Sequence, residues 1–227
     1  MEKGQLNKLK IKIAFYFPFA FIILGAVLFI PAGTIYWWHA WIFLAILISL
    51  AFFVTTYFFK RSPEFLERRI KFKEKEHTQK LIIAIADLVF FAGFVVAGLD
   101  FRFGWSHVPV WLVLMSDVIM TLSYSLIFLA FRENPYAART VETFPGQKLI
   151  DTGVYAVVRH PMYAGIIPMF LMIPLALGSF LAAIFIIPIC AILIARTLNE
   201  EDVLKRELKG YRQYCERVRW RIIPYVW

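Results

Sequence analysis

Five long apolar runs constrain the fold of this chain more than any other feature. They lie at about 13–30, 38–59, 81–99, 109–131 and 163–195. Each of the first four is close to the ~20 residues that an α-helix needs to cross a bilayer. The last is long enough for two short helices that turn near Leu177–Ser179. The strand alternation of membrane β-barrels is missing, so the sequence predicts an all-α fold.

Composition favours a membrane protein over a soluble one. Of the 227 residues, 60% are hydrophobic and 18% are charged. A soluble domain of this length has too little interior to bury so much apolar surface. We therefore expect a polytopic transmembrane helix bundle: four helices, then a C-terminal helical hairpin and a cytoplasmic amphipathic helix.

Basic residues are distributed very unevenly along the chain. All Lys and Arg residues except Arg102 lie before residue 13 or within 60–80, 132–159 and 196–221. Because cytoplasmic loops carry the excess of Lys and Arg, we expect both termini and the active site to be cytoplasmic, with an even number of crossings. The mixed charges of 60–80 predict a helix along the headgroups. Since each basic cluster flanks a span, membrane lipid is the expected partner and nucleic acid is not.

Motifs for metals and nucleotides are missing from the sequence. It has no zinc-ligand spacing, Walker loop or Gly-x-Gly-x-x-Gly fingerprint, and we expect no bound metal. Cys190 lies in an apolar run and Cys215 in the C-terminal segment, which argues against a disulfide. Several tryptophans cluster near the expected outer boundary, as in an aromatic belt. They are Trp37, Trp38, Trp41, Trp105 and Trp111.

Two carboxyl groups, Asp87 and Asp117, interrupt the apolar runs of the first half. One interpretation is a contact with substrate or with a transported proton. The other is an interhelical hydrogen bond or a protonated acid, and we favour this second interpretation.

The chain divides into a transmembrane region, 1–131, and a region that carries the chemistry, 132–227. Two polar clusters, Gly153–Gly165 and Arg196–Glu201, flank the last apolar run. If that run crosses the membrane and returns, both clusters lie on the same membrane face. Ionisable groups at a bilayer boundary are expensive, which indicates a functional role before a packing role.

The first of these clusters has the features of a helix start. Pro161 suits the first helical turn, so Arg159 and His160 lie at the mouth of a helix whose free N–H groups favour a carboxylate. Gly153 gives the preceding turn backbone freedom, and Gly165 permits close backbone approach. A helix mouth has few apolar contacts, so we expect His160, like the nearby Tyr163, to serve a ligand rather than the fold.

The second cluster begins a charged helix. Arg196 and Glu200 are four residues apart and share a face, whereas Glu201 is rotated by ~100°. We therefore expect Glu200→Gln to weaken ligand binding more than Glu201→Gln. From Leu204 to Cys215 an apolar stripe continues, which predicts that this final helix folds back over the site or the membrane surface.

Each cluster also has an ordinary structural explanation. A His-Pro pair is usually a helix start, and an Arg/Glu pair at this spacing is usually a weak surface ion pair. Together, at the two ends of one hairpin, they are more specific. They would surround a ligand with a carboxylate, an ammonium and a purine, where Glu200 meets the cation and Tyr155 and Tyr163 supply stacking or hydroxyl contacts.

The segment 147–165, together with Arg196, the Glu200-Glu201 pair and the Gly210-Tyr211-x-x-Tyr214 element, resembles the isoprenylcysteine carboxyl methyltransferase family. The resemblance covers about 132–227, and the earlier helices match in hydropathy alone. One departure is mild: the family commonly has Gly-Pro-Tyr where this chain has Gly153-Val154-Tyr155.

The resemblance implies an integral-membrane methyltransferase that uses S-adenosylmethionine. Arg196 would be the catalytic residue that holds the carboxylate of a lipophilic or lipidated acceptor, most simply a prenylcysteine-like molecule. The residues implied to line the cofactor share the two clusters and the loop before them. They are Gln147, Leu149, Ile150, Tyr155, His160, Pro161, Met162, Tyr163 and Glu200.

Other functions remain open. Phospholipid N-methyltransferases share the Arg-His-Pro-x-Tyr and Glu-Glu signatures, so the acceptor could be a lipid amine or thiol. Membrane sterol reductases share a His-Pro-x-Tyr element and an ending like 221–225, but they bind a nicotinamide cofactor. A non-catalytic membrane protein with a vestigial pocket is the third hypothesis.

Overall fold

The computed structural model describes residues 3–70, 77–136 and 146–227, and these are helical without a single strand. The long helices are α1 (Lys3–Ala32), α2 (Trp38–Arg61), α4 (His77–Phe103), α5 (Val110–Glu133), α6 (Pro161–Ala176) and α7 (Ile186–Glu207). The short ones are α3 (Pro63–Ile70), α8 (Tyr211–Arg217) and the 3-10 turns η1 (Gly153–Ala156) and η2 (Leu181–Phe185). The all-α polytopic bundle predicted from the sequence is confirmed.

Among the described residues, five helices are long and apolar enough to cross a membrane: α1, α2, α4, α5 and the continuous η2–α7. The protein is therefore an integral membrane protein. The sixth long helix, α6, has 16 residues, and it pairs with α7 as the predicted hairpin. The reversal falls at Leu177–Phe180, where Gly178 adopts a φ of +79° that suits glycine.

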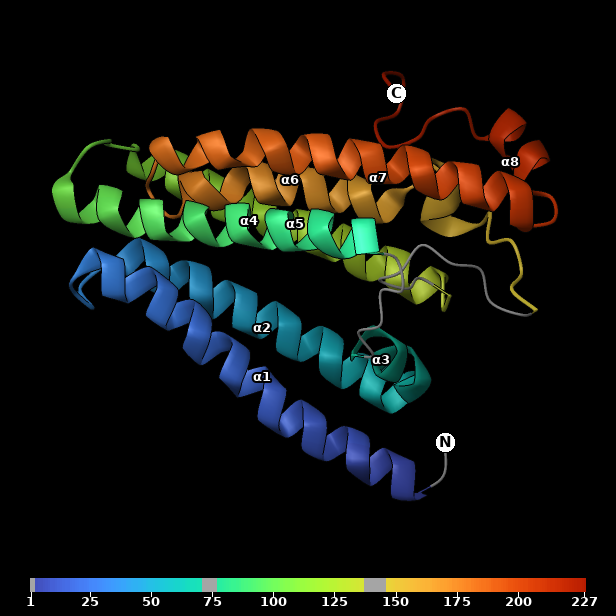
Figure 1. Cartoon of the computed structure of the whole chain (residues 1–227), viewed down its shortest axis with the longest axis horizontal. Helices are drawn as coiled ribbons and strands as arrows, with labels where there is room; N and C mark the ends of the chain where they lie inside the picture. The colour runs from blue at the N-terminus through green and yellow to red at the C-terminus, as the bar shows by residue number, and fades with distance from the viewer. Residues whose placement is uncertain (1–2, 71–76, 137–145) are drawn as a thin grey trace.

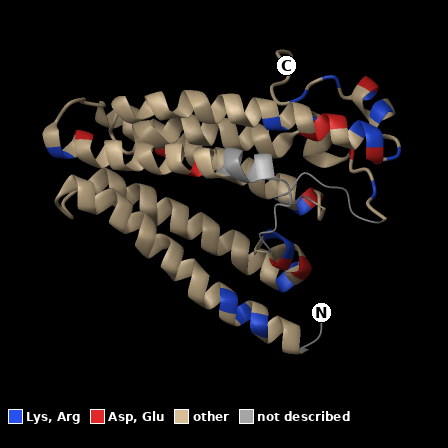
Figure 2. Ribbon diagram, viewed as in Figure 1, with Lys and Arg blue, Asp and Glu red and all other residues tan. Residues whose placement is uncertain are grey.

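The two ends of the bundle differ in their content of charged residues. Lys, Arg, Asp and Glu gather at the end where both termini, α3 and α8 lie (Figure 2), whereas the last turn of α4, which contains Arg102, is at the opposite end. The six long helices run between these ends (Figure 1), so both termini lie on one side. The headgroup helix predicted within 60–80 corresponds in part to α3. The rest of that segment, including Lys71, Lys73, Glu74, Lys75 and Glu76, lies outside or at the edge of the described residues.

The core is shared by both halves of the chain. Residues of α1, α2, α4 and α5 pack with Ile173 and Leu177 of the hairpin in one buried cluster. A second cluster at the charged end joins Phe58, Phe65 and Phe131, with Met162 against it. The division at residue 131 therefore has no counterpart in the packing, and it stays a functional prediction.

The closest helix pair is α5 with α6, and Gly165 permits the approach that the sequence predicted. A Cβ at Gly165 would lie 2.6 Å from Ile127 Cγ1 and 2.7 Å from the carbonyl oxygen of Ser123. Neither contact is tolerable, and the second is with backbone that cannot rotate away. The first turns of α6 can therefore lie directly against α5 because residue 165 has no side chain.

Gly165→Ala should destabilise the protein by about 1–3 kcal/mol, because α5 and α6 must move apart to admit the methyl group. For a chain of this length each kcal/mol corresponds to about 2–4 °C in the unfolding midpoint. Thermal unfolding in detergent measures the shift. The matched control is Gly25→Ala in α1, where an added Cβ meets nothing within 4 Å. Equal midpoints for the two variants would contradict the observed packing.

At the end opposite the termini, a buried carboxylate ties two turns together. Asp100 accepts a 2.7 Å hydrogen bond from the backbone N–H of Ser106, and the hydroxyls of Ser106 and Ser179 donate to its other oxygen. The loop after α4 is thereby joined to the turn after α6.

The predicted aromatic belt needs one correction. Trp37 is completely buried and stacks on Phe101, so it belongs to the core and not to the membrane boundary. The other four tryptophans of that set are exposed.

Candidate active site

A cavity opens at the charged end between the loop 146–152, the start of α6 and the end of α7. The space between these segments is about 870 Å³, part of it open to solvent. Every residue that the sequence analysis assigned to catalysis or to the cofactor lines this cavity. They are Gln147, Leu149, Ile150, Tyr155, His160, Pro161, Met162, Tyr163, Arg196 and Glu200.

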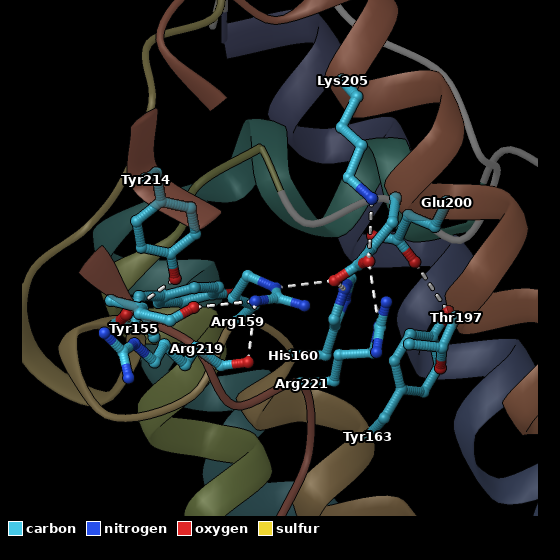
Figure 3. A network of polar contacts seen from close by, with 12 residues as sticks. Tyr155, Arg159, His160, Tyr163, Thr197, Glu200, Lys205, Tyr214, Arg219 and Arg221 are labelled. Carbon is cyan, nitrogen blue, oxygen red and sulfur yellow. Dashed lines mark hydrogen bonds and ion pairs between the residues drawn. The ribbon is translucent and has the colours of Figure 1, made fainter. Parts of the chain in front are cut away.

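The two polar clusters meet through one hydroxyl group. Tyr163 Oη donates a 2.9 Å hydrogen bond to Glu200 Oε2 and accepts a 3.0 Å bond from Arg196 Nε. Figure 3 shows Tyr163 and Glu200 facing each other from α6 and α7. The contact forms because α6 and α7 return to the same end, so residues 33 and 37 positions apart become neighbours. It places a cation and an anion side by side at one edge of the cavity.

Tyr155 is held by hydrogen bonds from two other segments. Its hydroxyl accepts a 3.3 Å hydrogen bond from Asn134 Nδ2, and its carbonyl oxygen accepts a 2.7 Å bond from Tyr214 Oη. Burial raises the pKa of Tyr155 to about 12, although the hydrogen bond with Asn134 acts in the opposite direction. The phenol therefore keeps its proton at neutral pH. The turn before it depends on Gly153, whose φ of +56° places it against the Glu133 side chain.

Glu201 is the centre of a buried ion-pair network that the sequence analysis missed. Its side chain is 1% exposed, and its carboxylate accepts hydrogen bonds of 2.6 Å from Arg159 Nε and 3.0 Å from Arg221 Nε. Lys205 Nζ lies 3.4 Å away (Figure 3). Glu201 thus joins the end of α7 to the segment before α6 and to the C-terminal tail. Helical geometry predicted that Glu201 faces ~100° away from Glu200. It could not predict that Arg159 and Arg221 lie on that side of α7, because they come from distant segments.

The position of His160 differs from the expectation. His160 is 5% exposed, and its Nε2 lies 3.4 Å from Glu201 Oε1 without making a well-formed hydrogen bond. The helix mouth is covered by the tail, because the backbone N–H groups of Arg159 and His160 donate to the carbonyls of Trp220 and Arg221. Glu201 lies next to the side chains of Arg159 and His160 at this mouth, and the two backbone N–H groups bind tail carbonyls rather than a carboxylate. His160 therefore contributes to the fold as well as to the cavity.

The C-terminal stripe is broken into two helices. α7 ends at Glu207, and Gly210 at φ +86° starts α8 in a new direction. Gly210 interrupts the helix despite the apolar spacing, and the segment folds back over the site as the sequence predicted. The break brings Tyr211 and Tyr214 over the cavity. Other lining residues that the sequence analysis left unassigned are Asn134, Tyr136, Lys148, Arg159, Val203, Leu204 and Leu208.

The hydroxyl of Tyr211 is buried, lines the cavity and lacks a hydrogen-bond partner among the described residues. Buried polar groups are nearly always paired, so this atom points to a ligand or an ordered water. Together with Glu200 and the apolar side chains of Leu149 and Met162, it suits a molecule with both polar and apolar parts.

Comparison with known proteins supports a membrane enzyme. Residues 111–210 match the family model described as phospholipid methyltransferase, a stretch of slightly less than half the chain. Over 105 residues the chain is 33% identical to Delta(14)-sterol reductase TM7SF2 of Mus musculus. The alignment covers 43% of this chain and 25% of that relative, so the chain spans about a quarter of the curated relative's length.

The family match begins in α5 and ends at Gly210, so it contains most of the residues that line the cavity. It supports a membrane methyltransferase, for which S-adenosylmethionine is the general methyl donor. The match does not distinguish a carboxyl methyltransferase from other membrane methyltransferases.

Proposed function

We propose that this protein is an S-adenosylmethionine-dependent membrane methyltransferase of the isoprenylcysteine carboxyl methyltransferase type. Its acceptor would be the carboxylate of a lipophilic, prenylcysteine-like molecule. One observation carries the proposal: a single cavity contains every residue that the resemblance assigns to cofactor and acceptor. The residues of the two motifs thus share one space that a ligand can enter.

The cavity fits the cofactor in chemistry. Glu200 would face its cationic amino acid part, the unpaired Tyr211 Oη and the imidazole of His160 would bind its polar groups, and Leu149 and Met162 would enclose its apolar parts. Gln147, Ile150, Tyr155, Pro161 and Tyr163 complete the proposed binding set. When bound, S-adenosylmethionine would supply a methyl group on a positively charged sulfur, and the neutral thioether would be the leaving group.

The residues of the chain would act by orientation. An acceptor carboxylate is ionised at pH 7, so no general base is required. Arg196 would hold that carboxylate, because a guanidinium binds both oxygens in one plane. Its bond to Tyr163 fixes the guanidinium, and Tyr163 in turn is fixed by Glu200. Alignment of this kind and exclusion of water can supply most of the rate acceleration.

The acceptor's hydrocarbon chain would lie in the membrane beside α6. A separate, almost wholly apolar cavity of about 1200 Å³ lies deeper in the bundle, bounded by residues of α1, α2, α4, α5 and α6. Met169 and Phe170 line it about 10 Å along α6 from Met162 of the active-site cavity. A lipid tail could enter there from the bilayer.

A reductase is the second candidate, because the mouse relative is named as a sterol reductase. Such an enzyme would place a nicotinamide dinucleotide in the same cavity. The charges of the lining do not separate the two cofactors, because Glu200 favours a cation while Lys148 and Arg196 of the same cavity favour a pyrophosphate.

Calorimetry in detergent tests the proposed function. We expect binding of S-adenosylmethionine and no binding of NADPH. Glu200→Gln should weaken S-adenosylmethionine binding about ten- to a hundredfold, as loss of a charge-assisted contact of about 1.5–3 kcal/mol requires. Asp202→Asn, exposed on the same helix, is the matched control. Binding of NADPH alone would favour the reductase, and binding of neither would favour a non-catalytic protein.

We also propose that the charged end and the active site face the cytoplasm, because Lys and Arg collect there. In a background with Cys190→Ser and Cys215→Ser, an impermeant thiol reagent should label Tyr36→Cys in intact cells. Lys209→Cys should react only after the membrane is permeabilised. Both positions are exposed, so accessibility does not explain a difference. Labelling of Lys209→Cys alone in intact cells would reverse the proposed orientation.

A further inference from the structure

Asp117 is a buried carboxyl group inside a transmembrane helix. It lies seven residues from the start of α5, about 10 Å along the helix and within the depth of the hydrocarbon core. Its side chain is 4% exposed, and neither carboxyl oxygen has a hydrogen-bond partner among the described residues. The interhelical hydrogen bond expected from the sequence is therefore not formed. An intramembrane ionisable residue without a partner is unusual and points to function.

A small cavity lies directly beside this group. It has about 370 Å³ of space, part of it open to the surroundings, between α2 and α5. Asp117 and Thr121 are the polar residues that line it, the carboxyl oxygens of Asp117 lie buried at its wall, and Ile46, Val118 and Leu122 are the apolar residues. Val118 and Leu122 are 58% and 64% exposed on the lipid-facing side of α5, so the opening is toward the bilayer.

The chemistry of the two polar groups narrows the ligand. An unpaired carboxylate is very costly in a bilayer, so Asp117 is neutral there and can both donate and accept a hydrogen bond. Thr121 Oγ1 donates a 2.8 Å bond to the Asp117 carbonyl oxygen, and its lone pairs can still accept. One group that donates once and accepts once satisfies both side chains.

A hydroxyl group meets this requirement and an ammonium does not. An ammonium would need a charged carboxylate and partners for its remaining N–H donors, and the walls beyond Thr121 are apolar. A hydrocarbon without a polar group would leave Asp117 unpaired. Water needs two to four polar partners and is scarce on the lipid-facing side.

We propose that Asp117 and Thr121 form a second binding site, open to the bilayer, for the hydroxyl group of a lipophilic alcohol. The site is distinct from the active-site cavity. Asn134, which lines that cavity beyond the other end of α5, is 17 residues away in sequence, roughly 25 Å along the helix. The proposal does not depend on the methyltransferase function.

Photolabelling of the protein in phosphatidylcholine vesicles tests the site. The probe is a photoreactive analogue of hexadecanol, and labelled positions are mapped by mass spectrometry. We expect label near Ile46, Val118 and Leu122. Excess hexadecanol should remove it, whereas hexadecane and hexadecylamine should not. Asp117→Leu should reduce labelling about five- to tenfold, and Asp117→Asn, whose amide also donates and accepts, should stay within about twofold of wild type.

Asp87→Leu is the matched control, because Asp87 is an exposed carboxyl group on another helix, and it should label like wild type. S-adenosylmethionine affinity should be the same in all three variants. A second readout needs no variant: hexadecanol should protect Asp117 from modification by a lipophilic carbodiimide, which reacts with protonated carboxyl groups.

Four results of the labelling experiment would overturn the proposal. They are equal labelling of Asp117→Leu and wild type, competition by hexadecane as strong as by hexadecanol, stronger competition by hexadecylamine, and cross-links between two copies through α5. Failure of hexadecanol to protect Asp117 from the carbodiimide would overturn it even if Asp117→Leu did not insert.

Discussion

Glu201→Gln should destabilise the folded protein by about 3–5 kcal/mol. The variant keeps the volume of the side chain and removes its charge. Arg159 is then left 7% exposed with no counter-charge at 2.6 Å, and Arg221 loses its contact at 3.0 Å. Breaking a buried ion pair from one side is more costly than never having formed it, because an uncompensated charge stays inside the protein.

The thermal unfolding midpoint in detergent measures this effect, with Glu200→Gln as the control on the adjacent residue. Glu200 lines the cavity and is outside the network of Glu201, so its variant should keep its midpoint. The sequence analysis treated Glu201 as the less important of the two. The structure reverses that order for stability, because Glu201 joins α7, the segment before α6 and the tail. Unchanged midpoints for both variants would show that the network contributes little.

Arg196→Lys should lower kcat/KM for the acceptor by about ten- to a hundredfold while cofactor affinity changes by no more than about threefold. Lysine keeps the charge and cannot make the planar two-point contact with a carboxylate. A charge-assisted bond of this kind contributes about 1.5–3 kcal/mol, which sets the size of the effect. The variant also loses the Nε–H that donates to Tyr163 at 3.0 Å.

Acceptor kinetics at saturating cofactor and cofactor calorimetry are compared in one preparation. Arg206→Lys, exposed near the end of the same helix, is the matched control and should match wild type in both measurements. If the cofactor dissociation constant rises tenfold while kcat and KM for the acceptor stay the same, Arg196 belongs to the cofactor and the carboxylate is held elsewhere.

Much of the fold could be predicted because a bilayer leaves few choices. The apolar runs had to be helices, since each unpaired backbone group in hydrocarbon is expensive. The hairpin followed from the length of 163–195, and it brought Tyr163 to Arg196 and Glu200. The prediction that separated clusters form one site therefore rested on the membrane as much as on the motifs.

What the sequence did not reveal depends on contacts between segments without a periodic pattern. The tail 218–227 carries no helical or strand period, yet its carbonyls accept hydrogen bonds from Arg159 and His160. Burial of His160 and of Glu201 is a consequence of that tail. The position of Trp37 in the sequence likewise indicated an exposed belt residue, but in the structure Trp37 stacks on Phe101 and is part of the core.

The central claim is tested most directly by methyl transfer from S-adenosylmethionine, tritiated on its methyl group, to an S-prenylated cysteine. The purified protein in lipid vesicles should produce radioactive lipid whose label is released by mild base as methanol, the signature of a carboxyl methyl ester. Glu200→Gln should reduce that signal and Asp202→Asn should not. Label that resists base would mean transfer to an amine or a thiol, and no transfer to this acceptor or to a panel of membrane lipids would contradict the assignment as a methyltransferase.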